Sequence, residues 1–164
     1  MESAEIVAHI PRLRRYARAL AGDGHRADDL VQDTLERALA KFYLWRRGSD
    51  LRAWLFTIMH NVFINQLKAR RELALDDAVA DGLQSAARSD PFELRDLDAA
   101  LRQLPVEQRE VLLLVGLEQL SYAEVGKALG IPVGTVMSRL SRGRERLRAV
   151  MSGTETATNL KVVK

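Results

Sequence analysis

The sequence contains no cysteine, and only 5% of its 164 residues are aromatic. Without thiols the chain can form no disulfide, no Cys-ligated zinc or iron–sulfur centre and no thiol-based active site or redox sensor. The scarcity of rings leaves the core to leucine, valine, alanine and isoleucine. No apolar run reaches the ~18 residues of a membrane span, and no charged-then-apolar leader opens the sequence. We therefore expect a cytoplasmic protein without direct membrane insertion.

Patterns typical of catalysis and metal binding are also missing. His9, His25 and His60 stand apart, and no cluster of His, Asp and Glu has the spacing of a metal site. His25 lies near Asp28 and Asp29, as in some phosphohydrolases, but capping and surface roles are commoner for such residues. No glycine-rich phosphate loop occurs. We expect no enzyme activity, no cofactor and no metal.

Charge is distributed unevenly, although the net charge is only +3. Residues 1–71 carry 13 basic and 8 acidic side chains, residues 72–98 carry 2 and 8, and residues 99–164 carry 10 and 6. Two basic blocks around an acidic segment favour a polyanionic partner such as nucleic acid. A solvated linker between ordinary surfaces explains the same pattern, so charge alone leaves both interpretations open.

Apolar residues recur at helical spacing in every long segment, and no convincing run alternates with a period of two. The pattern predicts an all-α protein of two small helical domains joined by a flexible linker. The domains are residues 1–72 and 92–151, with the linker at 73–91 and a frayed tail at 152–164. The helices are expected over 5–21, 26–44, 50–71, 92–103, 105–117, 122–129 and 133–149.

The helix expected over 26–44 has two contrasting faces. The inward face carries Val31, Leu35, Ala38, Leu39 and Phe42. The opposite face is polar and mostly acidic, and consists of Asp29, Gln32, Asp33 and Glu36. Surface helices commonly carry a solvated polar face of this kind. The functional alternative is a docking surface for a basic patch on a protein partner.

The helix expected over 50–71 has a different polar stripe, consisting of Thr57, Asn61, Asn65 and Lys68 and ending near Arg70 and Arg71. Asparagine is a mediocre helix former, but amides read base edges and basic groups hold phosphates. The preceding loop, Trp45-Arg46-Arg47-Gly48-Ser49, combines a ring with positive charge, which suits single-stranded nucleic acid. A core position is equally open for Trp45 and is the expected one for Trp54.

The C-terminal block predicts a helix-turn-helix unit. Ser121-Tyr122-Ala123-Glu124 has the form of a capping box, and Gly130 supplies the left-handed turn that ends the short helix. In the next helix Glu145 stands among Arg139, Arg142, Arg144, Arg146 and Arg148. In such a unit the first helix braces the second, which enters the major groove. A basic helical hairpin without a DNA role is the alternative.

Three segments together resemble the bacterial extracytoplasmic-function (ECF) sigma factors of the sigma-70 family. They are Asp28-Asp29-Leu30-Val31-Gln32-Asp33-Thr34, then Leu51-Arg52-Ala53-Trp54-Leu55-Phe56-Thr57-Ile58 with Asn61, and finally Leu120–Val125 continuing through Gly134–Arg144. The resemblance covers about residues 5–151. It implies an alternative sigma factor that binds core RNA polymerase and directs promoter recognition and transcription initiation, with sigma region two at 1–72 and sigma region four at 92–151.

The resemblance also implies roles for individual residues. The polymerase clamp would be bound by Asp29, Gln32, Asp33 and Glu36. The melted −10 element would be bound by Trp45, Arg46, Arg47, Gly48, Ser49, Asn61, Asn65, Lys68 and Arg71. The −35 duplex would be bound by Thr135, Met137, Ser138, Arg139, Ser141, Arg142, Arg144 and Arg148. Met137 stands where many relatives carry a basic residue, and Ser141 stands where a larger side chain is common.

Two further expectations concern partners and competing functions. Since the chain shows no long C-terminal extension that could act as a sensor, the resemblance implies control by a separate anti-sigma factor. The main alternative is a helix-turn-helix repressor or activator that is not a polymerase subunit. It explains residues 105–150 but leaves the Trp45 loop and the acidic face unexplained. A purely structural helical adaptor would make the clustering of arginines accidental.

Overall fold

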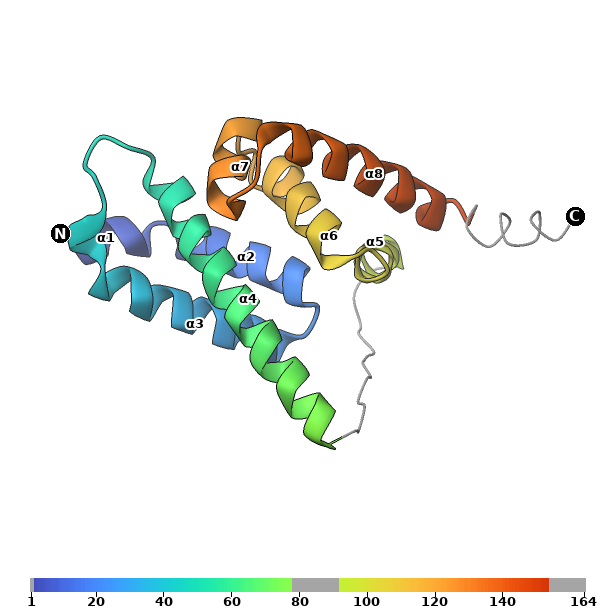
Figure 1. Ribbon diagram of the computed structural model, residues 1–164, viewed down its shortest axis with the longest axis horizontal. Coiled ribbons are helices and arrows are strands. Elements are labelled where there is room, and N and C mark those ends of the chain that lie inside the picture. The colour runs from blue at the N-terminus through green and yellow to red at the C-terminus, as the bar shows by residue number, and fades with distance from the viewer. Residues whose placement is uncertain (1, 78–91, 154–164) are drawn as a thin grey trace, which may run out of the picture. The chain divides into compact units, whose positions relative to one another are not determined.

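A computed structural model describes residues 2–77 and 92–153, and every regular element in these ranges is helical (Figure 1). The chain folds as two compact units, one built on the helices before residue 78 and one built mainly on the helices after residue 91, with residues 127–130 grouped with the first. The predicted all-α class with two helical domains is confirmed. Residues 78–91 of the expected linker and residues 154–164 of the expected tail lie outside the described residues.

The N-terminal unit contains five helical elements. They are α1 (Glu2–Val7), α2 (Ile10–Ala21), α3 (Gly24–Ala40), the 3-10 turn η1 (Phe42–Leu44) and α4 (Leu51–Asp77). The single helix expected over 5–21 is therefore two helices. The break falls at Ala8 and His9 because Pro11 lacks an N–H and is tolerated only in the first turn of a helix. Asp23 then caps α3 by accepting a hydrogen bond from the backbone N–H of His25 at 3.3 Å.

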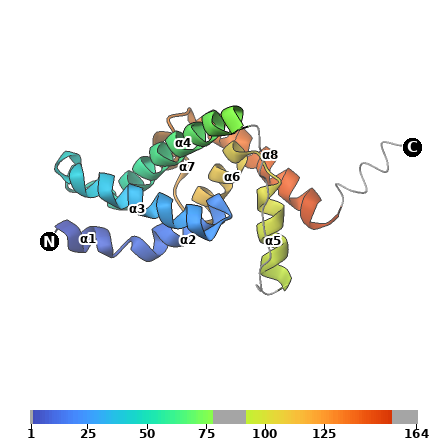
Figure 2. The same ribbon diagram turned by 90° about the horizontal axis from the view of Figure 1, so that it is seen from below.

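Helix α3 packs against both α2 and α4, and Figure 2 shows it lying between them. Tyr16 of α2 and Phe56 of α4 meet edge to face, with ring centroids 5.0 Å apart. On α3 the buried line includes Thr34, whose hydroxyl donates to the Leu30 carbonyl at 2.7 Å. The inward assignment of Leu39 is wrong, because Leu39 is 51% exposed. It lies ~100° around the helix from Ala38, which is the residue that faces the core.

Helix α4 is longer than the sequence pattern indicated. It continues to Asp77, six residues past the expected end at Arg71. The segment Glu72-Leu73-Ala74-Leu75 consists of strong helix formers, and this explains the continuation. Residues 73–77, which the sequence pattern assigned to the linker, are therefore helical and continue α4.

The C-terminal unit contains α5 (Phe92–Arg102), α6 (Val106–Leu112), the π turn η2 (Leu113–Leu117), α7 (Tyr122–Leu129) and α8 (Val133–Met151). The helix expected over 105–117 thus widens in its last turn, where the N–H of Glu118 donates to the Leu113 carbonyl at 3.0 Å. Gln119 follows in the left-handed region with φ of 59°. Helix α8 packs on α5 and α6, which fixes its inward side.

Two local devices hold α5, α6 and α8 together. Gly143 lets α8 come close to α6, since a Cβ at this position would lie only 3.2 Å from Cδ1 of Leu112. The guanidinium of Arg109 donates hydrogen bonds to the carbonyls of Leu101 at 3.0 Å and Leu104 at 3.1 Å. Arg109 thereby adds a second donor to the Leu101 carbonyl, which also accepts from the Leu104 N–H at 3.1 Å, and supplies a donor to the Leu104 carbonyl just after α5.

Candidate nucleic-acid interfaces

The predicted polar face of α3, called here the acidic face, consists of Asp29, Gln32, Asp33 and Glu36, and all four are exposed. One member is tied to the neighbouring helix, because Gln66 of α4 donates its amide N–H to Oδ2 of Asp33 at 2.8 Å. The acidic face therefore projects from a firmly packed helix, and Asp33 is held at its border with α4. Contact between this face and a partner remains a prediction.

Arg70 lies on α4, next to the border between that helix and the acidic face. Burial, and next the positive charge of Arg26, lower the pKa of Arg70 from its usual range, while Asp23 and Asp29 act in the other direction. These neighbours place Arg70 beside the start of α3. The sequence put Arg70 and Arg71 together at the end of one stripe, but only Arg71 is exposed.

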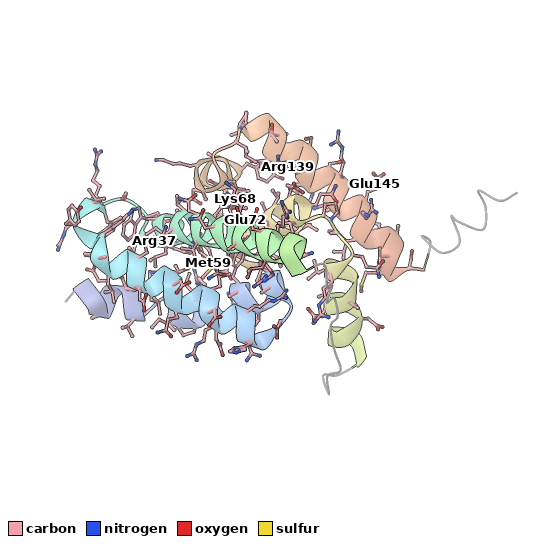
Figure 3. All side chains as sticks on the ribbon, turned by 60° about the horizontal axis from the view of Figure 1, so that its bottom comes forward. Arg37, Met59, Lys68, Glu72, Arg139 and Glu145 are labelled. Carbon is pink, nitrogen blue, oxygen red and sulfur yellow. The ribbon has the colours of Figure 1, made fainter. Side chains whose placement is uncertain are left out.

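The stripe along α4, called here the amide face, consists of Asn61, Asn65 and Lys68, and all three are exposed. Figure 3 shows Lys68 on this helix. Thr57 was expected to continue the stripe, but it is half-buried and its hydroxyl donates to the Ala53 carbonyl at 3.0 Å. The spacing of three and four residues places Asn61, Asn65 and Lys68 next to one another on successive turns, so they present two amides and one ammonium to solvent.

The loop between η1 and α4 begins with packed rings. The Trp45 ring lies against Phe42 with centroids 5.3 Å apart, and Phe42 meets the edge of Trp54 at 6.1 Å. Trp45 is half-buried, and its Nε1 is buried without a hydrogen-bond partner. The packing on Phe42 supports the core interpretation of Trp45, and its contact with nucleic acid stays a prediction.

The rest of the loop is a tight turn that projects positive charge. Ser49 donates both its backbone N–H, at 3.0 Å, and its hydroxyl, at 2.6 Å, to the Arg46 carbonyl. Gly48 has φ of 94°, a conformation that side chains with a Cβ rarely adopt. Arg46 and Arg47 are exposed on this turn. Gly48 and Ser49 therefore shape the loop, while the arginines are its charged groups.

Sequence reasoning missed two exposed side chains next to this loop. Tyr43 is 80% exposed and Leu44 is 60% exposed, both within η1. Their neighbour Phe42 is buried, so apolar periodicity gave no sign that the two following residues face solvent. Exposed large apolar side chains beside a cationic turn extend the surface on which unstacked bases can pack.

The turn before α8 has the predicted cap and a further constraint. The Ser121 N–H donates to Oε1 of Glu124 at 2.8 Å, and the Glu124 N–H donates to Oγ of Ser121 at 3.0 Å, which confirms the capping box. Gly130 is left-handed with φ of 71°, as expected. Gly126 was not identified from the sequence, although a Cβ there would lie 2.8 Å from the Ile131 carbonyl oxygen. Only glycine permits this close return of the chain.

Helix α8 has a buried inward side and an exposed outward side. Val136, Leu140 and Gly143 are buried. The outward side, called here the recognition face, consists of Met137, Ser138, Ser141, Arg142, Arg144 and Arg148, all of them exposed. Thr135 and Arg139 are half-buried at its edge, and Figure 3 shows Arg139 and Glu145 on this helix. The recognition face offers hydroxyl and guanidinium donors, which suit base edges and phosphates.

A hollow of about 300 Å³ opens between the start of α7 and α8. It is lined by Tyr122, Met137, Leu140, Ser141, Arg144, Glu145 and Arg148. In the described parts of the chain, no three His, Asp or Glu side chains are grouped as a metal site requires. Among the helices of residues 2–77 and 92–153, none combines the length and apolar character that a bilayer crossing needs.

Two known families match this chain, one in its N-terminal half and one in its C-terminal half. Residues 6–60 match the family described as the Sigma2 domain of PhyR. Residues 94–147 match the family described as Sigma-70, region 4. The first match includes the acidic face and the Trp45 loop, and the second includes the capping box and all of the recognition face except Arg148.

Whole-chain relatives carry one common description. The ECF RNA polymerase sigma factor EcfG of Rhodopseudomonas palustris is 42% identical over 153 residues, which are 90% of this chain and 83% of that protein. The ECF RNA polymerase sigma factor SigE of Mycolicibacterium smegmatis is 34% identical over 160 residues, which are 91% of this chain and 62% of that protein. Among solved structures, the sigma factor RpoE bound to the anti-sigma factor NepR from Bartonella quintana aligns with a TM-score of 0.81 and 37% identity, covering 92% of this chain and 96% of RpoE.

Proposed function

The chain belongs to the ECF RNA polymerase sigma factors, and we propose that it binds core RNA polymerase and directs promoter recognition and transcription initiation. The observation that carries this proposal is that the N-terminal unit presents two distinct exposed surfaces, the acidic face and the amide face, in addition to the recognition face of the C-terminal unit. A helix-turn-helix repressor needs only the last of the three.

The recognition face would read the −35 element as a duplex. Ser138, Ser141 and Arg142 are exposed on the outward side of α8, from which they would reach base edges in the major groove. Thr135, Arg139, Arg144 and Arg148 would hold phosphates on either side. Ser138 already donates its hydroxyl to the Thr135 carbonyl at 3.3 Å, so its oxygen is better placed to accept a hydrogen bond from a base amino group.

The N-terminal unit would bind the melted −10 element. Asn61 and Asn65 present amides that can pair with the edge of an unstacked base, and Lys68 with Arg71 can follow the backbone phosphates. Extruding a base costs a few kcal/mol, which stacking and edge hydrogen bonds must offset. Because Trp45 is packed on Phe42, its accessible part would serve as one wall of the base pocket, with Arg46 and Arg47 holding the strand nearby.

The acidic face would dock on a basic surface of the polymerase clamp. Asp29, Asp33 and Glu36 carry three negative charges on an exposed helix face, which favours a cationic partner and makes docking sensitive to salt. The bond between Gln66 and Asp33 fixes that carboxylate before docking, so less side-chain freedom is lost on binding.

The remaining parts of the proposal concern control and location. RpoE was solved with the anti-sigma factor NepR, and a second similar structure is CnrH in complex with the cytosolic domain of CnrY, at a TM-score of 0.70 and 26% identity. By this likeness, an anti-sigma factor would hold the present chain inactive. We further infer that the chain acts in the cytoplasm and without enzymatic activity, since its surfaces serve binding.

Run-off transcription with purified core polymerase across a promoter library tests the proposal. The full chain should programme core polymerase to start at one class of promoter, whereas a repressor would bind the duplex and give no transcript. Asn61→Ala should reduce strand opening, measured by permanganate reactivity of unpaired thymines, and should leave binding of the −35 duplex unchanged. Absence of any association with core polymerase would refute the proposal.

A further inference from the structure

Met137 is the apolar member of an otherwise polar recognition face. Its side chain is 51% exposed, although methionine gains from burial. The other residues expected to bind the −35 duplex all carry hydroxyl or guanidinium groups. A thioether has no hydrogen-bond donor and is only a weak acceptor, so Met137 cannot contribute as its neighbours do.

The surroundings of Met137 form an apolar recess with a charged rim. Tyr122 and Leu140 line the same hollow as Met137, and Arg144, Glu145 and Arg148 line it further along α8. Ser141, one turn after Met137, is exposed and small, so it leaves the hollow open beside the methionine. The recess is therefore accessible from the side on which the recognition face would meet DNA.

The chemistry of the major groove restricts what such a recess can accept. Base edges there present ring nitrogens, carbonyl oxygens and amino groups, and the apolar exception is the 5-methyl group of thymine. A methionine pressed against a polar edge would remove water from that edge without replacing its hydrogen bond, which is unfavourable. Contact with a methyl group carries no such cost and buries apolar surface on both sides.

We propose that Met137 reads the 5-methyl group of one thymine in the −35 element, with the methyl group seated at the mouth of the hollow beside Tyr122 and Ser141. The proposal rests on the proposed function, because it requires α8 to lie in the major groove of a promoter. It makes Met137 a determinant of sequence preference that acts by shape and apolar contact, next to donors that act by hydrogen bonding.

Replacement of single thymines by uracil tests the proposal, because uracil lacks only the methyl group. Polymerase programmed with the full chain is bound to promoter duplexes in which each −35 thymine, on either strand, is changed in turn. At one position uracil should weaken binding about fourfold, the factor equivalent to losing the burial of one CH₂-sized group. Met137→Ala should bind the thymine and uracil forms of that position equally, and Met137→Leu should keep the preference.

Val133→Ala provides the matched control, because Val133 is 43% exposed on α8 and does not line the hollow. This variant should keep the fourfold ratio between thymine and uracil. Two results would overturn the proposal: uracil accepted without loss at every position, or a ratio that persists in Met137→Ala. In either case the proposed function stands if the unaltered chain still binds the promoter duplex in a salt-dependent way. If the unaltered chain binds no promoter, both the proposed function and the role of Met137 are overturned.

Discussion

The two units share a buried apolar core but differ in how much they depend on close backbone packing. The N-terminal unit relies on large buried side chains, among them Phe56, Leu55 and Met59, and on the edge-to-face contact of Phe56 with Tyr16. The C-terminal unit also has a buried apolar core, which includes Leu114, Val111 and Val136, but it depends in addition on close backbone approaches at Gly126 and Gly143. Both units should therefore be sensitive to the removal of core atoms, and the C-terminal unit should also be sensitive to the addition of a single carbon at either glycine.

The difference matches what each unit would have to recognise. A duplex is a regular object, and a helix that enters its groove must project from an exact backbone position. A melted strand is flexible, and it can adapt to stacking and amide groups that stand on a well-packed core. Four substitutions test this contrast.

The largest effect is expected from Phe56→Ala in the N-terminal unit. Phe56 is 1% exposed, and its removal leaves a cavity beside Tyr16, so the free energy of unfolding should fall by about 3–5 kcal/mol. Urea denaturation of the full chain measures the change. The matched control is Tyr43→Ala, since this ring is 80% exposed and its loss should cost less than about 0.5 kcal/mol. Similar losses for both rings would contradict a side-chain-based core.

Gly126→Ala should produce the next largest effect, in the C-terminal unit. The added Cβ would lie 2.8 Å from the Ile131 carbonyl oxygen, so the backbone must shift, at a cost of about 1–3 kcal/mol. Thermal unfolding and binding of −35 duplex report the loss. Gly134→Ala is the control, because nothing lies within 4 Å of its Cβ and alanine there should stabilise α8 by about 0.5–1 kcal/mol. If both variants stabilise the unit, backbone proximity is not what holds the turn.

Ser121→Ala should destabilise α7 by about 1 kcal/mol, because it removes the acceptor of the Glu124 N–H. Hydrogen exchange of amides in the first turn of α7 should quicken by a corresponding factor. Ser121→Asp keeps an acceptor at the same position and should restore most of the protection. Unchanged exchange in Ser121→Ala would show that the cap contributes nothing measurable.

The smallest effect is expected at His9, which precedes α2. Burial, followed by the charge of Arg12, lowers the pKa of His9 from the usual 6.5. The unfolded chain then binds more protons than the folded one, so the contribution of His9 to stability is full above pH 6.5 and is lost as the pH falls through the folded pKa. In His9→Gln the melting temperature should depend less on pH between pH 6.5 and the folded pKa of His9. If the slope of melting temperature against pH equals that of the unaltered chain, this role of His9 is excluded.

What the sequence predicted correctly were features within a few residues of one another. Helical periodicity placed the acidic, amide and recognition faces on solvent, and the Ser121–Glu124 spacing identified a cap that the structure contains. Pro11 marks the break before α2, but the apolar pattern continues across it and predicts one helix.

Features between distant segments were not predictable in this way. The bond from Gln66 to Asp33 joins residues 33 positions apart, and no local pattern marks either partner. The constraint on Gly126 depends on the path of the chain after α7, and the role of Gly143 depends on α6. Leu39 fits a helical stripe, but the width of the covered part of α3 is set by α2 and α4.

Gly143 has a consequence for how promoter preference could change. Its bare backbone rests against Leu112, so the height of α8 above α6 is set by a leucine on the far side from any base. A bulkier residue at 112 would lift the recognition face outward without altering one of its side chains. Under the proposed function, sequence preference would therefore change through positions that never touch a nucleotide.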